Sequence, residues 1–101
     1  MKFGLTQSEI ELLRSLALDP LKRQGARVWL FGSRARGDYK PFSDIDLLYE
    51  VPEGVLLPAG VLGRIEEELE DSNLPYKVDI VNLDEIASSY RDGILADRIP
   101  V

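Results

Sequence analysis

Two aspartates with one residue between them open a segment that is typical of a β-strand. Asp44 and Asp46 begin the stretch DIDLLYEV, in which side chains alternate between the two faces of a strand. Both carboxylates therefore project from one face, with their Cα atoms about 7 Å apart. Like charges at this spacing repel each other unless cations lie beside them, and Mg²⁺ and Mn²⁺ prefer hard oxygen ligands. Alone the pair is a weak signal, because aspartate is also common in turns.

A third carboxylate lies in another predicted strand. Asp79 stands in KVDIVN between the β-forming residues Val78 and Ile80, where an unpaired charge is costly to bury. If the strands that carry Asp46 and Asp79 are neighbours in register, the three carboxylates converge. Such a cluster can hold two metal ions about 4 Å apart for displacement at phosphorus. The alternative is an Asp79 at an edge strand, paired with Lys77 or an arginine.

A Gly-Ser turn and two arginines precede the aspartate pair. Gly32 lets the backbone approach a phosphate closely, and Ser33 offers its hydroxyl and amide at the start of a short helical turn. Arg34 and Arg36 lie within reach to neutralise phosphate charge or to pair with carboxylates. By default both arginines are solvated, and we expect Arg36 rather than Arg34 to be a structural tether. The order of the whole segment, rather than any one residue, favours a phosphate-and-metal site.

Composition excludes several kinds of chemistry. The chain has 101 residues, which predicts a single domain over 1–101 with one modest core. It contains no cysteine and no histidine, which excludes disulfides, zinc fingers, thiol nucleophiles and imidazole bases. The net charge of −6 disfavours stable binding to nucleic acid or to an anionic membrane. No window approaches a membrane span of about 20 apolar residues, and we expect a cytoplasmic protein.

The elements that must position these residues follow from periodicity and capping patterns. Thr6 and Glu9 form a capping-box pattern for a first helix, which we expect Asp19-Pro20 to interrupt. Strands are predicted at 26–31, 44–51 and 77–82, a helical turn at 34–37 and a helix at 61–73. This order predicts a compact α/β or α+β domain with a small sheet.

Three further segments are less regular. A last helix is predicted to begin with Asn82 as its N-cap and Glu85 at the capping-box position. The connection over 52–60 is apolar for a loop, which favours either a lid on its own domain or contact with a partner. The tail over 96–101 is compatible with a strand or a loop.

The segment GSRARGDYKPFSDIDL, residues 32–47, resembles the signature of the DNA polymerase beta-like nucleotidyltransferase superfamily. That signature is Gly-Ser, then Ala-Arg-Gly, a spacer and Ser-Asp-x-Asp. In size and acidity the chain is similar to the minimal nucleotidyltransferase (MNT) antitoxins that pair with HEPN-domain toxins. The resemblance extends from the first predicted strand to the third. It implies an α/β (α+β) nucleotidyltransferase fold, with a small mixed sheet of three or four strands flanked by about four helices.

The resemblance also implies a role for each matching residue. The nucleotide-phosphate contacts match Gly32, Ser33 and Arg36, with Arg34 at a variable position. The metal ligands match Asp44, Asp46 and Asp79, the last of which also activates the acceptor hydroxyl. ATP is implied as nucleotide donor, with two Mg²⁺ ions, or Mn²⁺, as cofactors. In the antitoxin branch the acceptor resembles a tyrosine hydroxyl of the cognate HEPN toxin, an RNase silenced by transfer of AMP.

Three functions stay open on these grounds. The first is a protein adenylyltransferase that acts as an antitoxin in a complex with its toxin. The second is a non-catalytic module that neutralises its partner by covering it, which the apolar stretch over 55–62 favours. The third keeps the chemistry but uses a small molecule or an RNA end as acceptor. The acidic charge counts against RNA, and the absence of a substrate domain counts against an enzyme that modifies antibiotics on its own. Assembly as a homo- or hetero-oligomer is compatible with all three.

Overall fold

The sheet of the computed structural model, which describes residues 1–101, contains four strands. They are β1 (Arg27–Phe31), β2 (Ile45–Glu50), β3 (Val78–Asn82) and β4 (Ile99–Pro100). Their order across the sheet is β3-β2-β1-β4. β1 pairs antiparallel with both β2 and β4, whereas β2 and β3 run parallel. The expected small mixed sheet is therefore confirmed.

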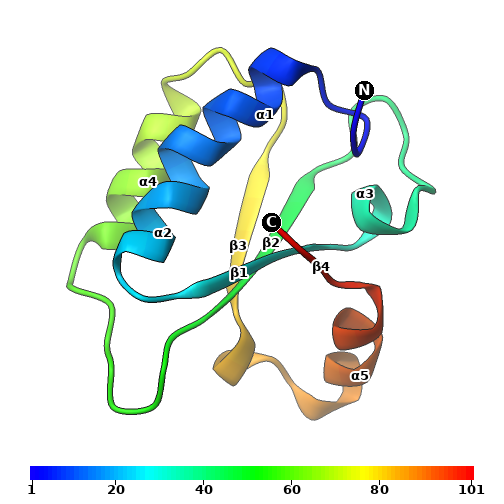
Figure 1. Ribbon diagram of the computed structural model, residues 1–101. Coiled ribbons are helices and arrows are strands. Elements are labelled where there is room, and N and C mark those ends of the chain that lie inside the picture. The colour runs from blue at the N-terminus through cyan, green and yellow to red at the C-terminus, as the bar shows by residue number, and fades with distance from the viewer.

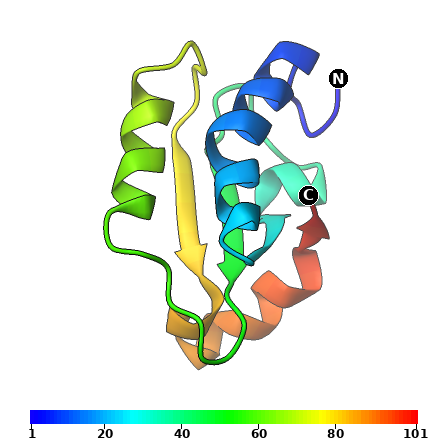
Figure 2. The same ribbon diagram turned by 60° about the vertical axis from the view of Figure 1, so that its left-hand side comes forward.

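Helices cover both faces of this sheet (Figures 1 and 2). One continuous N-terminal helix consists of α1 (Gln7–Leu13), the π-helical segment η1 (Arg14–Leu18) and α2 (Asp19–Arg23). The others are α3 (Ser33–Arg36), α4 (Val61–Glu70), the 3₁₀ turn η2 (Leu83–Glu85) and α5 (Ser88–Asp97). The N-terminal helix and α4 lie side by side on one face, and α5 lies on the other. None of these helices is long and apolar enough to cross a membrane.

Pro20 does not interrupt the first helix, contrary to the expectation from sequence. The helix begins with the predicted capping box, in which Thr6 Oγ1 accepts from the Glu9 N–H at 3.2 Å and Glu9 Oε1 accepts from the Thr6 N–H at 2.8 Å. It then passes into a π-helical turn, where the Asp19 N–H donates to the Arg14 carbonyl. A proline ring normally collides with the carbonyl four residues earlier. The wider π turn relieves this, so that Pro20 stands in the first turn of α2.

The core is divided between the two faces because side chains alternate along each strand. The larger cluster lies under the N-terminal helix and α4. From the sheet it receives Val28, Leu30, Ile45, Leu47 and Tyr49. The smaller cluster lies under η2 and α5 and is formed by Trp29, Leu48 and Leu83. The predicted alternation along the second strand is confirmed, and it places the Asp46 side chain on the same face as that of Leu48.

The segment after β3 differs from the prediction. Asn82 does act as a cap, but its Oδ1 accepts from the Asp84 N–H at 3.0 Å to close η2 rather than a long helix. Ile86 and Ala87 are extended, and Ile86 packs against the smaller cluster, so that α5 begins only at Ser88. An extended segment that contains the packed side chain of Ile86 therefore separates η2 from α5. The end of the tail forms β4.

The apolar connection between β2 and α4 is partly buried and partly open. Leu57 packs against the larger cluster, as a lid on its own domain would. Val55 is 40% exposed and Leu56 is 89% exposed. The segment thus has features of both expected alternatives.

Candidate active site

The turn between β1 and α3 brings the backbone directly against a carboxylate. Gly32 has φ 77° and ψ −156°, a conformation that L side chains rarely adopt. A Cβ atom built on Gly32 would overlap Oδ2 of Asp46. The preceding residue, Phe31, is the register partner of Asp46 across the β1–β2 pair. Glycine is therefore required for this approach, and Ser33 follows it at the start of α3, where N–H groups lack helical partners.

Asp46 and Asp79 are register partners on the parallel strands β2 and β3. Their side chains lie on the same face of the sheet, because partners in register share the pleat. Asp44 precedes Asp46 by two residues and therefore projects toward this face as well. Asp44 is exposed, whereas Asp46 and Asp79 are half-buried. The strand pairing that the sequence left as a condition is thus present, and it places Asp46 and Asp79 side by side, with Asp44 just before the strand.

The charges of this cluster act on Asp46 above all. Burial raises the pKa of the Asp46 carboxyl, and the negative charges of Asp79 and Asp44 raise it further. The positive charges of Arg36 and Arg34 lower it in part. Ionisation of Asp46 is therefore opposed in the protein alone, which is the situation that a bound cation relieves.

The donor set fits a hard divalent cation in its chemistry, although the side chains do not converge on a common centre. Carboxylate oxygens are the ligands that Mg²⁺ and Mn²⁺ prefer. As the side chains stand, however, no three acidic groups form a set that could hold an ion. Lys77 Nζ lies 3.4 Å from Asp79 Oδ1 and supplies the local positive charge instead. The structural alternative of a Lys77–Asp79 ion pair is thus present alongside the predicted cluster.

A cavity of about 520 Å³ adjoins the pair and is lined by both Asp46 and Asp79. It extends between β3 and α4 and therefore reaches the edge of the sheet. A reacting group could enter from this side, because Asp79 is 40% exposed.

Arg34 is a buried structural tether of the site, contrary to the expectation that it is solvated and that Arg36 is the better candidate for a tether. It is only 2% exposed. Its Nε and Nη2 donate to the Ser43 carbonyl at 3.0 and 2.8 Å, and its Nη1 donates to the Phe3 carbonyl at 3.0 Å. The rings of Tyr39 and Tyr76 lie 5.3 and 4.3 Å from its Cζ. Every guanidinium nitrogen is engaged in this way, so the geometry argues against a phosphate contact for Arg34.

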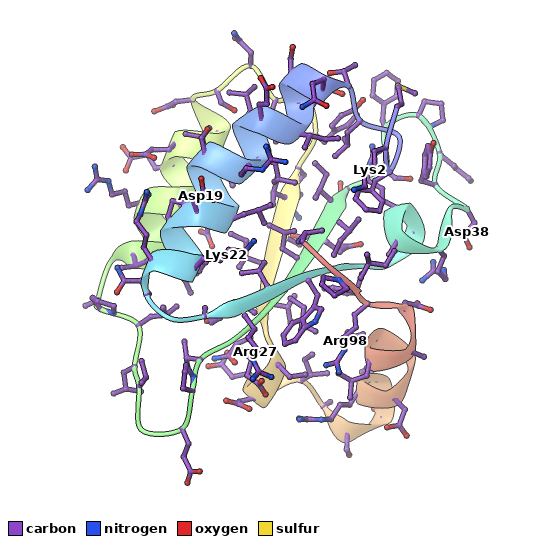
Figure 3. All side chains as sticks on the ribbon, in the orientation of Figure 1. Lys2, Asp19, Lys22, Arg27, Asp38 and Arg98 are labelled. Carbon is purple, nitrogen blue, oxygen red and sulfur yellow. The ribbon has the colours of Figure 1, made fainter.

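Arg36 is the arginine at the surface, and two carboxylates hold it. Its Nη1 lies 2.8 Å from Asp97 Oδ2, and its Nε lies 3.2 Å from Asp38 Oδ2. Asp38 lies at the surface beyond α3 (Figure 3). The hydrogen bond to Asp97, followed by the one to Asp38, raises the pKa of Arg36 above its ordinary value. Asp97 could not be predicted as a partner of Arg36, because the two residues lie 61 positions apart in the chain.

Comparison with known proteins identifies the family. The nucleotidyltransferase domain matches residues 11–101, which is most of the chain. The chain belongs to this family. The assignment agrees with the Gly-Ser turn and the aspartates that the fold brings together, and the chain is accordingly a nucleotidyltransferase.

Two relatives of this nucleotidyltransferase are named as protein adenylyltransferases. It is 36% identical over 91 residues to "Putative protein adenylyltransferase MJ0435" of Methanocaldococcus jannaschii, covering 90% of this chain and 95% of the relative. It is 35% identical over 69 residues to "Probable protein adenylyltransferase MntA" of Haemophilus influenzae. That match covers 66% of this chain and 57% of the relative, so the chain matches little more than half of that protein.

Solved structures show the same fold for this nucleotidyltransferase. A "putative minimal nucleotidyltransferase" superposes with a TM-score of 0.69 at 33% identity, covering 100% of this chain and 97% of the other. A toxin–antitoxin crystallised with AMP-PNP gives a TM-score of 0.64 at 19% identity, covering 86% and 70%. The first likeness confirms the nucleotidyltransferase fold, and the second shows that the toxin–antitoxin chain shares it.

Proposed function

We propose that this nucleotidyltransferase transfers AMP from ATP to the hydroxyl group of a tyrosine on a cognate HEPN toxin. By this transfer it acts as an antitoxin. The observation that carries this proposal is the register of Asp46 with Asp79 beside the Gly32 turn. It unites acidic ligands with a backbone that a phosphate can approach. The names of the two relatives support AMP transfer to a protein. The solved structure of a toxin–antitoxin with AMP-PNP supports an adenine nucleotide as donor and a toxin as partner.

The acidic cluster is the proposed metal site. Asp44, Asp46 and Asp79 would hold two Mg²⁺ ions, or Mn²⁺. Burial, and then the negative charges of Asp79 and Asp44, raise the pKa of Asp46, and a bound cation would offset both effects. When bound, the ions would neutralise phosphate charge and polarise the α-phosphate. Lys77 would give up its ion pair with Asp79 on binding.

The protein groups have distinct tasks in the proposed reaction. The Gly32 backbone and Ser33 bind the phosphates of ATP, and Arg36 pairs with them from the surface. Asp79 takes the proton of the acceptor hydroxyl and passes it to water. The hydroxyl oxygen forms a bond to the α-phosphorus while the bond from that phosphorus to the α,β-bridging oxygen breaks, and pyrophosphate leaves with the electron pair.

Transfer of label from ATP tests the proposal. The chain would be incubated with α-labelled ATP, Mg²⁺ and the HEPN protein encoded beside it, and we expect the partner to become labelled. Asp46→Asn should abolish labelling. Asp84→Asn, an equal change at an exposed position of η2 beyond the end of β3, should leave it intact. Labelling that survived loss of both Asp44 and Asp46 would show that the assigned site is wrong.

A second candidate function is neutralisation by binding alone. It is favoured by the exposed apolar side chains of Val55 and Leu56 between β2 and α4. Toxin inhibition that the double change Asp44→Asn, Asp46→Asn left undiminished would favour this function. Inhibition lost by that variant, with binding retained, would favour catalysis.

A further inference from the structure

The two edges of the sheet differ in how well they are protected. At one edge, β4 has only two residues, and Pro100 has no N–H with which to pair. At the other edge, β3 has five residues, all of them half-buried and none of them proline. Natural proteins usually protect an open edge with proline, lysine or a bulge. Beside β3 the one such residue is Lys77, immediately before the strand.

The backbone of β3 presents unpaired groups at this edge. The Ile45 N–H donates to the Lys77 carbonyl at 2.9 Å. In a parallel pair, alternate residues of a strand bond to the same neighbour, so Asp79 faces β2 while the peptide groups of Val78 and Ile80 point outward. No turn, loop or side chain bonds to the backbone of Val78 or Ile80. Both residues can therefore pair with an additional strand.

The cavity along this edge has an apolar base and an acidic border. We call it the β3 groove, and Figure 2 shows the two elements that line it, α4 and β3. Its buried or half-buried apolar residues include Leu69, Leu74, Val78 and Ile80. Its acidic residues are Glu66 and Glu70 of α4 with Asp46 and Asp79 of the sheet. Lys77 is the one basic residue in its lining.

We propose that the β3 groove binds an extended, basic segment of the protein that accepts AMP, which adds to the edge of the sheet as a further strand. This inference rests on the proposed function. Strand addition supplies main-chain hydrogen bonds, and the alternation of side chains supplies specificity. A second copy of this chain would bring two acidic borders together, so charge disfavours self-pairing in the groove.

The alternation of side chains also determines which residues of the bound segment face the acidic cluster and which face α4. A hydroxyl residue beside Asp79 shares the face of the acidic cluster. Its immediate neighbours then point to the opposite face, toward α4. A lysine or arginine there can lay its apolar stem over Ile80 and Leu69 and bring its charge to Glu66 and Glu70. The expected acceptor segment therefore has a basic residue directly next to the modified hydroxyl residue.

Amide hydrogen exchange tests the docking mode on the intact chain with the HEPN protein encoded beside it. We expect the partner to slow exchange at Val78 and Ile80 about tenfold or more, while Asp79, already paired with β2, changes little. Absence of binding, or binding without protection at Val78 and Ile80, would overturn the inference. Protection that rises with the concentration of the chain alone would assign the edge to a second copy and would also overturn it.

Charge variants test the acidic border separately. Glu66→Lys and Glu70→Lys should each raise the KM for the HEPN protein about fivefold, with kcat and the KM for ATP unchanged. Glu67→Lys is the matched control, because Glu67 is exposed on the same helix and does not line the groove. Equal effects of all three changes would indicate net charge alone and contradict the groove.

The two sets of results separate this inference from the proposed function. Protection of Val78 and Ile80 without any transfer of label would refute the AMP-transfer reaction and leave the docking mode standing. Transfer of label without that protection would refute the docking mode and leave the reaction standing.

Discussion

Arg36 on α3 and Asp97 at the end of α5 form an ion pair across 2.8 Å, which joins the phosphate cradle to the last helix. The guanidinium is the group expected to pair with phosphate, and in the protein alone a carboxylate already occupies it. In the proposed reaction ATP would therefore compete with Asp97 and Asp38 for Arg36. This competition would give α5 an influence on nucleotide binding even though α5 carries none of the proposed acidic ligands.

Removing the charge of Asp97 should strengthen ATP binding. In Asp97→Asn the guanidinium of Arg36 loses its pair with Asp97 and keeps only that with Asp38. We expect the KM for ATP to fall about two- to fivefold, the scale of an exposed ion pair. Asp92→Asn is the control, because Asp92 is exposed on the same helix and forms no ion pair. Steady-state kinetics with varied ATP measure the effect. A KM that rose in Asp97→Asn would show that the ion pair positions Arg36 rather than competing for it.

The raised pKa of Asp46 predicts a particular pH dependence of stability. Its protonated form is favoured in the folded state, so its contribution is fully present below the ordinary value of 3.8 and is lost as pH rises through the higher folded pKa. At pH 7 without divalent cations, Asp46→Asn should therefore melt a few degrees above the wild type, since about 1 kcal/mol corresponds to about 4–8 °C.

Thermal denaturation under two further conditions tests the predicted effect of Asp46→Asn on stability. Below pH 3.8 the difference between wild type and Asp46→Asn should shrink, because both side chains are then neutral. Mg²⁺ should raise the melting temperature of the wild type and not that of the variant. A variant less stable than the wild type at pH 7 would contradict the electrostatic account.

Loss of the buried Arg34 should destabilise the fold strongly. Arg34→Met leaves the carbonyls of Ser43 and Phe3 without their donors, which costs about 2–4 kcal/mol of the free energy of unfolding. Arg34→Lys should recover little, because an ammonium lacks the planar fork that reaches both carbonyls. Urea denaturation measures the loss, with Arg23→Met at the exposed end of α2 as control. A small effect at Arg34 would mean that the tether is dispensable.

A methyl group at Gly32 should impair catalysis. In Gly32→Ala the new Cβ overlaps Oδ2 of Asp46 and the positive φ becomes strained, so the carboxylate must move. We expect kcat/KM to fall about a hundredfold, the usual effect of misplacing a catalytic group by about 1 Å. Gly63→Ala, on α4 with no atom near its Cβ, should retain activity. Unchanged activity in Gly32→Ala would remove the close approach from the mechanism.

Part of the site could be predicted from sequence because the signals are local. Strand alternation placed Asp44 and Asp46 on one face, and turn chemistry favoured a close approach at Gly32. The neighbour that the structure shows there is Asp46, whereas the expected neighbour was a phosphate. From sequence, Asp79 could be placed beside Asp46 only if their two strands were neighbours in the sheet, and local sequence does not determine which strands pair. That pairing joins strands that are separated by α4 in the chain, so the local sequence around each aspartate does not report it.

Other features were mispredicted because distant residues decide them. Arg34 is buried since the N-terminal turn, 31 residues before it, supplies the carbonyl of Phe3. Arg36 was expected to be solvated or a tether, and it is exposed and paired with Asp97, but this partner lies too far along the chain to be predicted. Pro20 was expected to interrupt the first helix, because proline normally does so. The prediction was wrong because the preceding turn shifts to π-helical hydrogen bonding, a shift that periodicity does not detect.

The parallel pairing of β2 with β3 also has a consequence for how the protein folds. The strands are connected through α4, so their pairing requires closure of a long crossover, whereas β1 and β2 are joined by a shorter connection. Contacts between distant parts of a chain are slow to form. Asp46 and Asp79 therefore meet only when this crossover has closed. A ligand that needs both carboxylates would bind only chains in which β2 and β3 have paired, and its addition during refolding would report that pairing.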